Sequence, residues 1–235
     1  MNSINRYKPT DKMSNIIFRN YSLISVMSRF GLPLGFGEKT VKEICDRQNV
    51  DCNTFLAVVN FMEEEQYGYE YDAETDRISL PALMDYLKQA HSYFLDFNLP
   101  SIRKQLKEAL ELEPENNDVT QSILMFYDKY EAEVHRHMEY ENKFVFEYVD
   151  NLISGKATGS YRIKNFAQKH NHIEQNLTEL KNIIIKYYPQ ETCNNLLNAT
   201  LFDIFHCESD LNLHCKLEDE LFTPAVAELE KKIFK

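Results

Sequence analysis

The fold is decided by two stretches that share one pattern, His137-Met138-Glu139-Tyr140-Glu141-Asn142-Lys143-Phe144 and His214-Cys215-Lys216-Leu217-Glu218-Asp219-Glu220-Leu221-Phe222. In each stretch a glutamate follows the histidine by four residues, and an acid or amide and then an aromatic residue come after that glutamate. A lone histidine precedes each stretch at a similar interval, His91 before the first and His170 before the second. This duplication predicts two helix pairs related by pseudo-symmetry.

The spacing of the duplicated pattern indicates metal binding. Residues four apart lie on one face of an α-helix, so each histidine and its glutamate can reach the same metal centre. All four histidines also lie within stripes of apolar residues at helical spacing; the stripe around His137 runs through Phe126, Val134, Glu141 and Phe144. Imidazole with carboxylate suits iron, manganese or zinc. The sequence therefore predicts a binuclear transition-metal site in a helical core, with six ligands: His91, His137, Glu141, His170, His214 and Glu218.

A histidine with a glutamate one turn later is a weak signal by itself. His135 with Glu139 also fits the spacing, but this pair lies roughly 200° around the helix from the apolar stripe and is interpreted as a solvated face. A lone histidine on an apolar stripe is more often a hydrogen-bonded core residue. Four histidines in phase favour ligands, because two buried glutamates need a cation to compensate their charge. His172 and His206 fall off the stripes and are interpreted as surface or supporting groups.

Composition excludes several function classes. The chain has 235 residues, 43% of them hydrophobic, and a formal net charge of −11. An acidic chain lacks the basic face that nucleic acid requires, and no apolar run approaches the length of a membrane span. The five cysteines form no Cys-x-x-Cys pair, and residues 1–12 lack an apolar signal segment. We therefore expect a cytoplasmic protein with reduced thiols, one that binds neither nucleic acid nor membrane.

The pattern of helices and breaks predicts an all-α protein with two domains. A small helical N-terminal domain is expected over residues 1–78, with helices over Ile16–Phe30, Thr40–Arg47 and Asp51–Gln66. Thr40 and Glu43 have the spacing of a capping box. The Tyr-rich stretch Tyr67–Arg77 marks the domain boundary.

The second predicted domain, residues 79–235, is a four-helix up-down bundle with the ligands near the middle of its helices. Its helices are expected over Pro81–Leu112, Val119–Ile153 and Tyr161–Tyr187, and from Pro189 through Phe222 toward the C-terminus. Pro100 predicts a kink in the first of them.

These residues resemble a known family, the hemerythrin-like HHE cation-binding proteins, and within it the ScdA/YtfE type that repairs iron centres. The resemblance covers nearly the whole chain, including the N-terminal domain. It is carried by His170 and by three further pieces: Asp85-Tyr86-Leu87 to His91 with Leu99-Pro100, His137 to Glu141 with Phe146, and His214 to Glu218 with Leu221-Phe222 and Pro224.

The resemblance implies a non-haem di-iron centre, with manganese or zinc as substitute metals. It implies that Glu141 and Glu218 bridge the two irons and that the four histidines divide two per iron. An oxo or hydroxo bridge and a small ligand, oxygen or nitric oxide, would complete the coordination. The implied function is repair of iron–sulfur clusters after nitrosative or oxidative stress, by donating iron or handling nitric oxide. The implied partners are damaged iron–sulfur proteins and a second copy in a homodimer.

The N-terminal domain departs from the family in one respect. Its members usually carry adjacent cysteines followed by glycines in the first interhelical turn, where this chain has Leu34-Gly35-Phe36-Gly37. Cys45 and Cys52 lie on later elements and are interpreted as packed, small apolar side chains. The domain is therefore expected to serve in docking or dimerisation.

Two other functions use the same metal site. One is a sensor or carrier that binds oxygen or nitric oxide reversibly, as in hemerythrin. The other is a di-iron oxidoreductase, in which Tyr130 or Tyr148 would take part in redox steps, although both tyrosines are interpreted as core aromatics.

Overall fold

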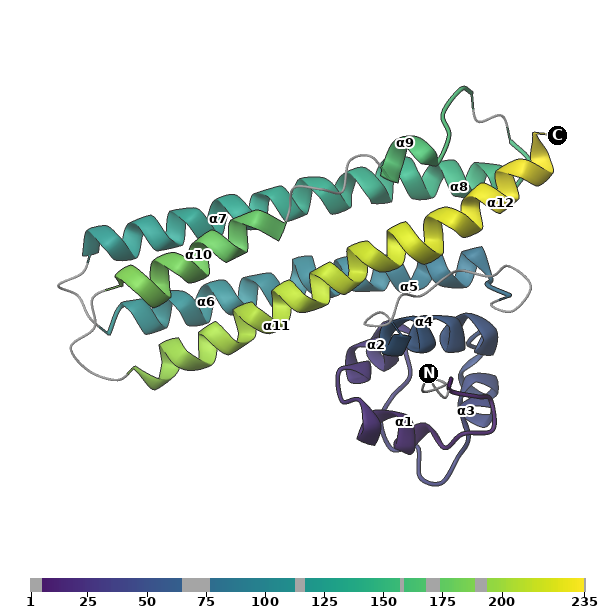
Figure 1. Cartoon of the computed structure of the whole chain (residues 1–235), viewed down its shortest axis with the longest axis horizontal. Helices are drawn as coiled ribbons and strands as arrows, with labels where there is room; N and C mark the ends of the chain where they lie inside the picture. Colours follow the sequence, from purple (N-terminus) through teal and green to yellow (C-terminus); the bar gives the residue numbers. More distant parts are fainter. Residues whose placement is uncertain are drawn as a thin grey trace, which may run out of the picture. The chain divides into compact units, whose positions relative to one another are not determined.

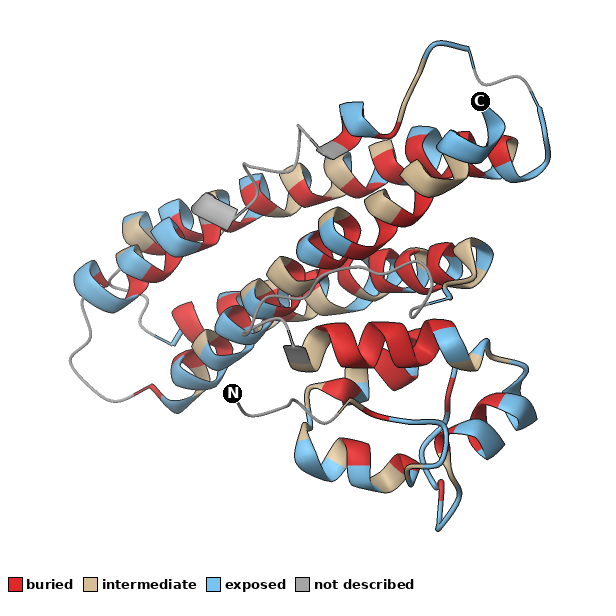
Figure 2. Cartoon of the chain, turned by 45° about the vertical axis from the view of Figure 1, so that its right-hand side comes forward, coloured by how far each residue is buried: buried red, intermediate tan, exposed pale blue. Residues whose placement is uncertain are grey.

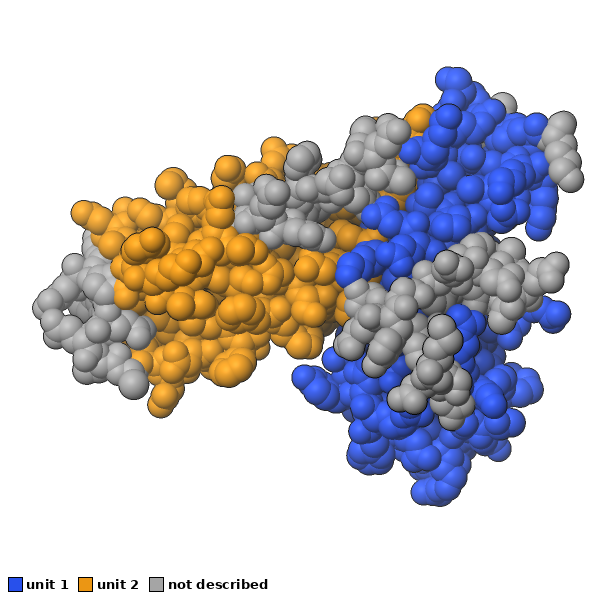
Figure 3. Space-filling model, in the orientation of Figure 1, with its two compact units in different colours: residues 1–90, 148–164, 216–235 blue, residues 91–147, 165–215 orange. Residues whose placement is uncertain are grey.

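The computed structural model describes residues 6–64, 77–112, 117–156, 159–167, 174–188 and 194–234. All regular structure in these ranges is helical, apart from one isolated bridge between Lys12 and Thr40, which confirms the predicted all-α class. The chain divides into two compact units (Figure 3): residues 1–90, 148–164 and 216–235 form the first, and residues 91–147 and 165–215 form the second. The predicted domain boundary after residue 78 stays a prediction, because most of the connector lies outside the described residues.

The second unit contains stretches of four helices that lie side by side (Figure 1). They are α6 (Leu99–Leu110), α7 (Asn117–Tyr140), α10 (Glu174–Tyr187) and most of α11 (Asn195–Leu217). Only short connections join α6 to α7 and α10 to α11, as expected for neighbouring helices of an up-down bundle.

Contacts between neighbouring helices connect these four helices in a closed ring. The hydroxyl group of Tyr127 on α7 donates to the carbonyl group of Leu99 on α6 at 2.8 Å, and α7 also packs against α10. Thr178 on α10 donates to Glu208 on α11 at 3.0 Å. The ring closes where Asn194, just before α11, donates to the carbonyl group of Ala109 on α6 at 2.8 Å.

The sides of these helices that face one another are buried, and the outer sides are exposed (Figure 2). The fully buried positions recur at helical spacing, as expected for amphipathic helices. In the second unit they include Phe94, Leu106, Ile123, Tyr127, Val134, Phe146, Ile204 and Cys207.

In the described part of the chain, three of the bundle helices contain a π-helical turn. The turns are η2 (Tyr93–Asn98) between α5 (Leu80–Ser92) and α6, η4 (Glu141–Val145) between α7 and α8 (Phe146–Ile153), and η5 (Glu218–Phe222) between α11 and α12 (Thr223–Ile233). Each turn keeps the chain helical, because the residues at its two ends have right-handed helical backbone angles. The sequence predicts a kink at Pro100. The structure has the π-helical turn η2 beside this position, and η2 ends at Asn98, two residues before the proline.

The π turns change which residues face the core. A π turn bonds residues five apart, so one extra residue enters the helix and the inward face shifts. Phe144, predicted for the buried stripe of Glu141, is 51% exposed, and the next buried residues are Val145 and Phe146. Phe126 is only half-buried, with Tyr127 taking the core position. The prediction for Phe144 is wrong because it assumed an unbroken α-helical period.

The N-terminal region folds into α1 (Met13–Arg19), α2 (Leu23–Arg29), α3 (Val41–Gln48) and α4 (Cys52–Glu64). The single helix predicted over Ile16–Phe30 is wrong. The chain turns at Asn20, whose backbone is extended and whose side-chain oxygen accepts the N–H of Ser22 at 3.1 Å. Asparagine favours such turns because its side chain replaces a backbone partner.

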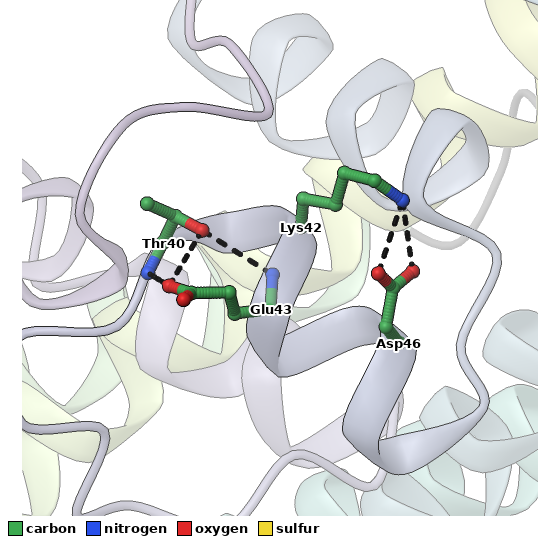
Figure 4. Close-up of polar contacts among 4 residues, drawn as sticks. All are labelled: Thr40, Lys42, Glu43 and Asp46. Carbon is green, nitrogen blue, oxygen red and sulfur yellow. Dashed lines mark hydrogen bonds and ion pairs between the residues drawn. The ribbon is translucent and has the colours of Figure 1, made fainter.

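The capping box predicted at the start of α3 is confirmed (Figure 4). The N–H of Glu43 donates to the hydroxyl oxygen of Thr40 at 3.3 Å, and the N–H of Thr40 donates to the carboxylate of Glu43 at 2.8 Å. These bonds satisfy backbone donors that the first helical turn leaves without partners.

The remaining predicted helices agree with the structure where it describes them. The third bundle helix is seen as α9 (Lys164–Ala167) and α10, with residues 168–173 between them outside the described ranges. The fourth begins at Asn195 and continues to Ile233. Among the described residues, no helix combines the length and the apolar character that crossing a bilayer requires.

The capping box gives a test of stability. Replacing Thr40 by Ala removes both hydrogen bonds of its hydroxyl group, and we expect it to lower the free energy of unfolding by about 1 kcal/mol. Chemical denaturation followed by circular dichroism measures this. The control is Lys42→Ala, which removes an exposed ion pair with Asp46 and should change stability much less. Equal effects of the two substitutions would contradict the capping role.

Candidate metal centre

Glu141 lies between two imidazoles in the second unit. Its side chain has no exposed surface. One carboxylate oxygen, Oε2, is 3.3 Å from Nε2 of His91, and the other, Oε1, is 2.7 Å from Nε2 of His137. Each oxygen therefore faces a different histidine, which is the arrangement of a carboxylate that bridges two metal ions.

The two ring nitrogens of His91 contact different groups. Nδ1 is 3.0 Å from the side-chain oxygen of Asn142, and Nε2 faces Oε2 of Glu141. Since the amide oxygen only accepts, Nδ1 donates to it, and in the neutral imidazole Nε2 then carries the lone pair. That lone pair and the carboxylate oxygen repel unless a proton or a metal cation lies between them.

His214 completes this group from the opposite helix. Its Nε2 is 3.1 Å from Nε2 of His91, and its side chain is buried. Glu218, also buried, follows His214 by one helical turn. The ligand atoms of His91, Glu141 and His214 all lie within 4.8 Å of one another. Metal–ligand bonds of about 2.0–2.2 Å put opposite ligands of one ion about 4 Å apart, so the group has the dimensions of a metal site.

A second set of metal-binding side chains in the same unit adjoins the first. A ligand atom of His137 lies within 4.8 Å of the sulfur of Cys215. Glu141 reaches both His91 of the first group and His137 of this second set. One buried carboxylate therefore contacts both sets.

The sixth predicted ligand, His170, lies outside the described residues, as does His172. Its role as a ligand stays a prediction. The histidines that were set apart from the ligands behave differently: His206 is exposed, and His135 is half-buried beside an exposed Glu139. Neither His135 nor His206 belongs to a metal-binding group among the described residues.

Two aromatic rings fix the orientation of the imidazoles. Phe146 stacks on His91 with 5.5 Å between ring centroids, and Phe94 meets His214 edge-on at 5.9 Å. Both phenylalanines are buried, so they also exclude water from this side of the group. A site with less water has a lower effective dielectric constant, which strengthens the attraction between the carboxylates and a cation.

Sequence reasoning assigned no role to Asn142 or Cys215. Asn142 is the amide that follows the glutamate in the first copy of the pattern, so the repeated pattern already marked this position as one of interest. Cys215 carried no such signal, because a cysteine within an apolar helix usually packs as a small apolar side chain.

Two of the π turns begin at the proposed glutamate ligands. Glu141 is the first residue of η4, and Glu218 is the first residue of η5. The repeat in the sequence is therefore also a repeat in the backbone. Single π turns inside α-helices occur frequently at functional sites, where they redirect side chains.

The tyrosines considered for redox chemistry are engaged elsewhere or deeply buried. The hydroxyl group of Tyr148 donates to Glu230, and burial raises the pKa of Tyr148. Burial likewise raises the pKa of Tyr130. In the N-terminal region, burial raises the pKa of the Cys45 thiol to about 12, so it stays protonated near neutral pH. A protonated thiol is a poor nucleophile. This agrees with the interpretation of Cys45 as a packed apolar side chain and not as a reactive one.

A comparison with protein families identifies most of the chain. The model of the family described as "Hemerythrin HHE cation binding domain" matches residues 82–226, which is more than half of the sequence. The matched range contains all six predicted ligands and the three π turns. The chain matches no curated protein and no solved structure.

The ligand assignment can be tested with matched histidines on one helix. His214→Ala removes an imidazole from the buried group, and we expect the purified variant to lose metal, as measured by elemental analysis after anaerobic loading with ferrous iron. His206→Ala, two turns earlier on α11 and exposed, should leave the metal content unchanged. Equal losses in the two variants would show that the metal binds elsewhere.

Proposed function

Since the chain belongs to the hemerythrin HHE cation binding domain family, we propose that it is a non-haem di-iron protein that repairs iron–sulfur clusters damaged by nitrosative or oxidative stress. Membership in this family makes the chain a metal-binding protein, and its cluster of histidines and glutamates suits iron. The observation that carries the di-iron proposal is the position of Glu141, whose two oxygens face the imidazoles of His91 and His137.

The residues divide between two metal positions. His91 and His214 would hold one iron, and His137 and His170 the other, with Glu141 and Glu218 shared between them. The bound irons would supply open positions for nitric oxide or oxygen and a store of transferable ferrous iron. Asn142 fixes the tautomer of His91, and Phe94 and Phe146 keep the imidazoles oriented. Such supporting contacts typically change metal affinity by about 10- to 100-fold.

The proposed ligands differ in how far solvent reaches them. The side chain of His137 is 15% exposed, whereas those of His91 and Glu141 are 2% and 0% exposed. A position at an accessible edge can release iron or admit a small gas more readily than a sealed one. This difference favours an iron donor over a reversible carrier, which needs an enclosed apolar pocket.

The partners and location follow from the same proposal. The clients would be proteins with damaged iron–sulfur clusters, and the N-terminal domain would dock them or join two copies of the chain. None of the four cysteines in the described ranges forms a disulfide, which fits a reducing compartment such as the cytoplasm.

Restoration of a damaged enzyme tests the proposal. The full-length protein, loaded with two ferrous irons per chain, is added anaerobically to a hydro-lyase whose [4Fe–4S] cluster has been destroyed by nitric oxide. We expect the hydro-lyase activity to return, and to return less with Glu141→Gln, because that variant loses the bridging charge. Glu139→Gln, which changes an exposed carboxylate on the same helix, is the matched control and should restore as the wild type does.

Two results would contradict the repair function. One is restoration no greater than that produced by the same amount of free ferrous iron. The other is reversible binding of nitric oxide or oxygen by the iron-loaded protein without any restoration, which identifies a sensor or carrier.

A further inference from the structure

Cys215 lies among metal-binding side chains. It is buried, with 8% of its surface exposed, and it directly follows His214 on α11. Its sulfur lies within 4.8 Å of a ligand atom of His137, whereas His214 belongs to the group of His91 and Glu141. Two neighbouring residues of one helix thus serve two different ligand groups.

The position of Cys215 differs from that of a packed core cysteine. Cys207 provides the comparison, because it lies two turns earlier on the same helix and is 1% exposed. Among the described residues, Cys207 belongs to no group of metal-binding side chains, although it is more deeply buried than Cys215. Burial alone therefore does not explain why Cys215 lies beside the imidazole of His137.

The dimensions allow coordination by sulfur. Metal–sulfur bonds are about 2.3 Å and metal–nitrogen bonds about 2.0–2.1 Å, so a sulfur and a nitrogen on one ion are at most about 4.4 Å apart. The sulfur of Cys215 and a ligand atom of His137 lie no more than 4.8 Å apart, which is close to this distance. A small adjustment of the two side chains would bring both atoms within bonding distance of one metal ion. Thiolate together with imidazole and carboxylate is a donor set for iron or zinc.

We propose that Cys215 is a thiolate ligand of the metal position at His137, so that the two metal positions differ in their donors. The inference rests on the proposed function, because it assumes a metal at that position. On coordination the thiol releases its proton to solvent and the sulfur bonds to the metal, without a change of oxidation state. One metal is then held by nitrogen and oxygen alone, and the other by nitrogen, oxygen and sulfur.

Cobalt substitution tests this inference without any assay of activity. The full-length protein is loaded anaerobically with Co²⁺, and its absorption is recorded through the visible and near-ultraviolet ranges. We expect visible ligand-field bands together with a near-ultraviolet sulfur-to-cobalt charge-transfer band. Cys215→Ser should keep the ligand-field bands of the remaining site, lose the charge-transfer band, and weaken cobalt binding at one position by about tenfold or more. Cys207→Ser should match the wild type in all three respects.

The outcomes separate this inference from the proposed function. Ligand-field bands without a charge-transfer band in the wild type would overturn the thiolate while leaving the metal site intact. A band that persists in Cys215→Ser would assign the sulfur to another cysteine and also overturn it. Failure of the wild type to bind cobalt or iron would overturn the metal site and the thiolate together. If Cys215→Ser lacks the wild-type circular dichroism, protection of Cys215 from alkylation in the cobalt-loaded wild type decides, and equal alkylation with and without cobalt overturns the proposal.

Discussion

A carboxylate without exposed surface, that of Glu141, is the constraint on which the rest of the bundle depends. A buried negative charge costs several kcal/mol unless it is compensated, and the groups facing Glu141 are the Nε2 atoms of His91 and His137. With Nδ1 of His91 donating to Asn142, the neutral imidazole directs the lone pair of Nε2 toward this carboxylate. A metal cation between the two atoms would remove the resulting repulsion, and it would be bound in the folded state only, so metal binding would add to stability.

The π turns connect this constraint to the helices. Glu141 and Glu218 each begin such a turn, and a helix with one extra residue presents a different face to the core beyond that point. The ring of contacts among α6, α7, α10 and α11 holds the second unit together, with Tyr127 and Asn194 bonding to backbone carbonyl groups of α6. Two of the π turns in the described residues thus begin at proposed ligands.

The sequence predicted the all-α class, the four bundle helices and the capping box of Thr40, because each depends on local periodicity or spacing. It also predicted which histidines and glutamates lie together, since residues four apart on an apolar stripe share a face; their role as ligands stays a prediction, as does the place of His170. It did not predict the exposure of Phe144, because the helical period used for the prediction assumed an unbroken α-helix through the π turn η4. The turn at Asn20 was missed because an apolar period continued across it. The place of Cys215 beside His137 depends on how separate helices pack, which no local pattern contains.

The central claim is that two metal ions share Glu141 and Glu218. Mössbauer spectroscopy of the iron-loaded protein after oxidation tests it most directly, because two ferric ions that share bridging ligands couple antiferromagnetically. The account predicts two irons per chain with a diamagnetic ground state. The spectrum would then consist of quadrupole doublets, and in a strong applied magnetic field the field at each nucleus would equal the applied field. Magnetically isolated high-spin ferric ions, or a single iron per chain, would contradict it.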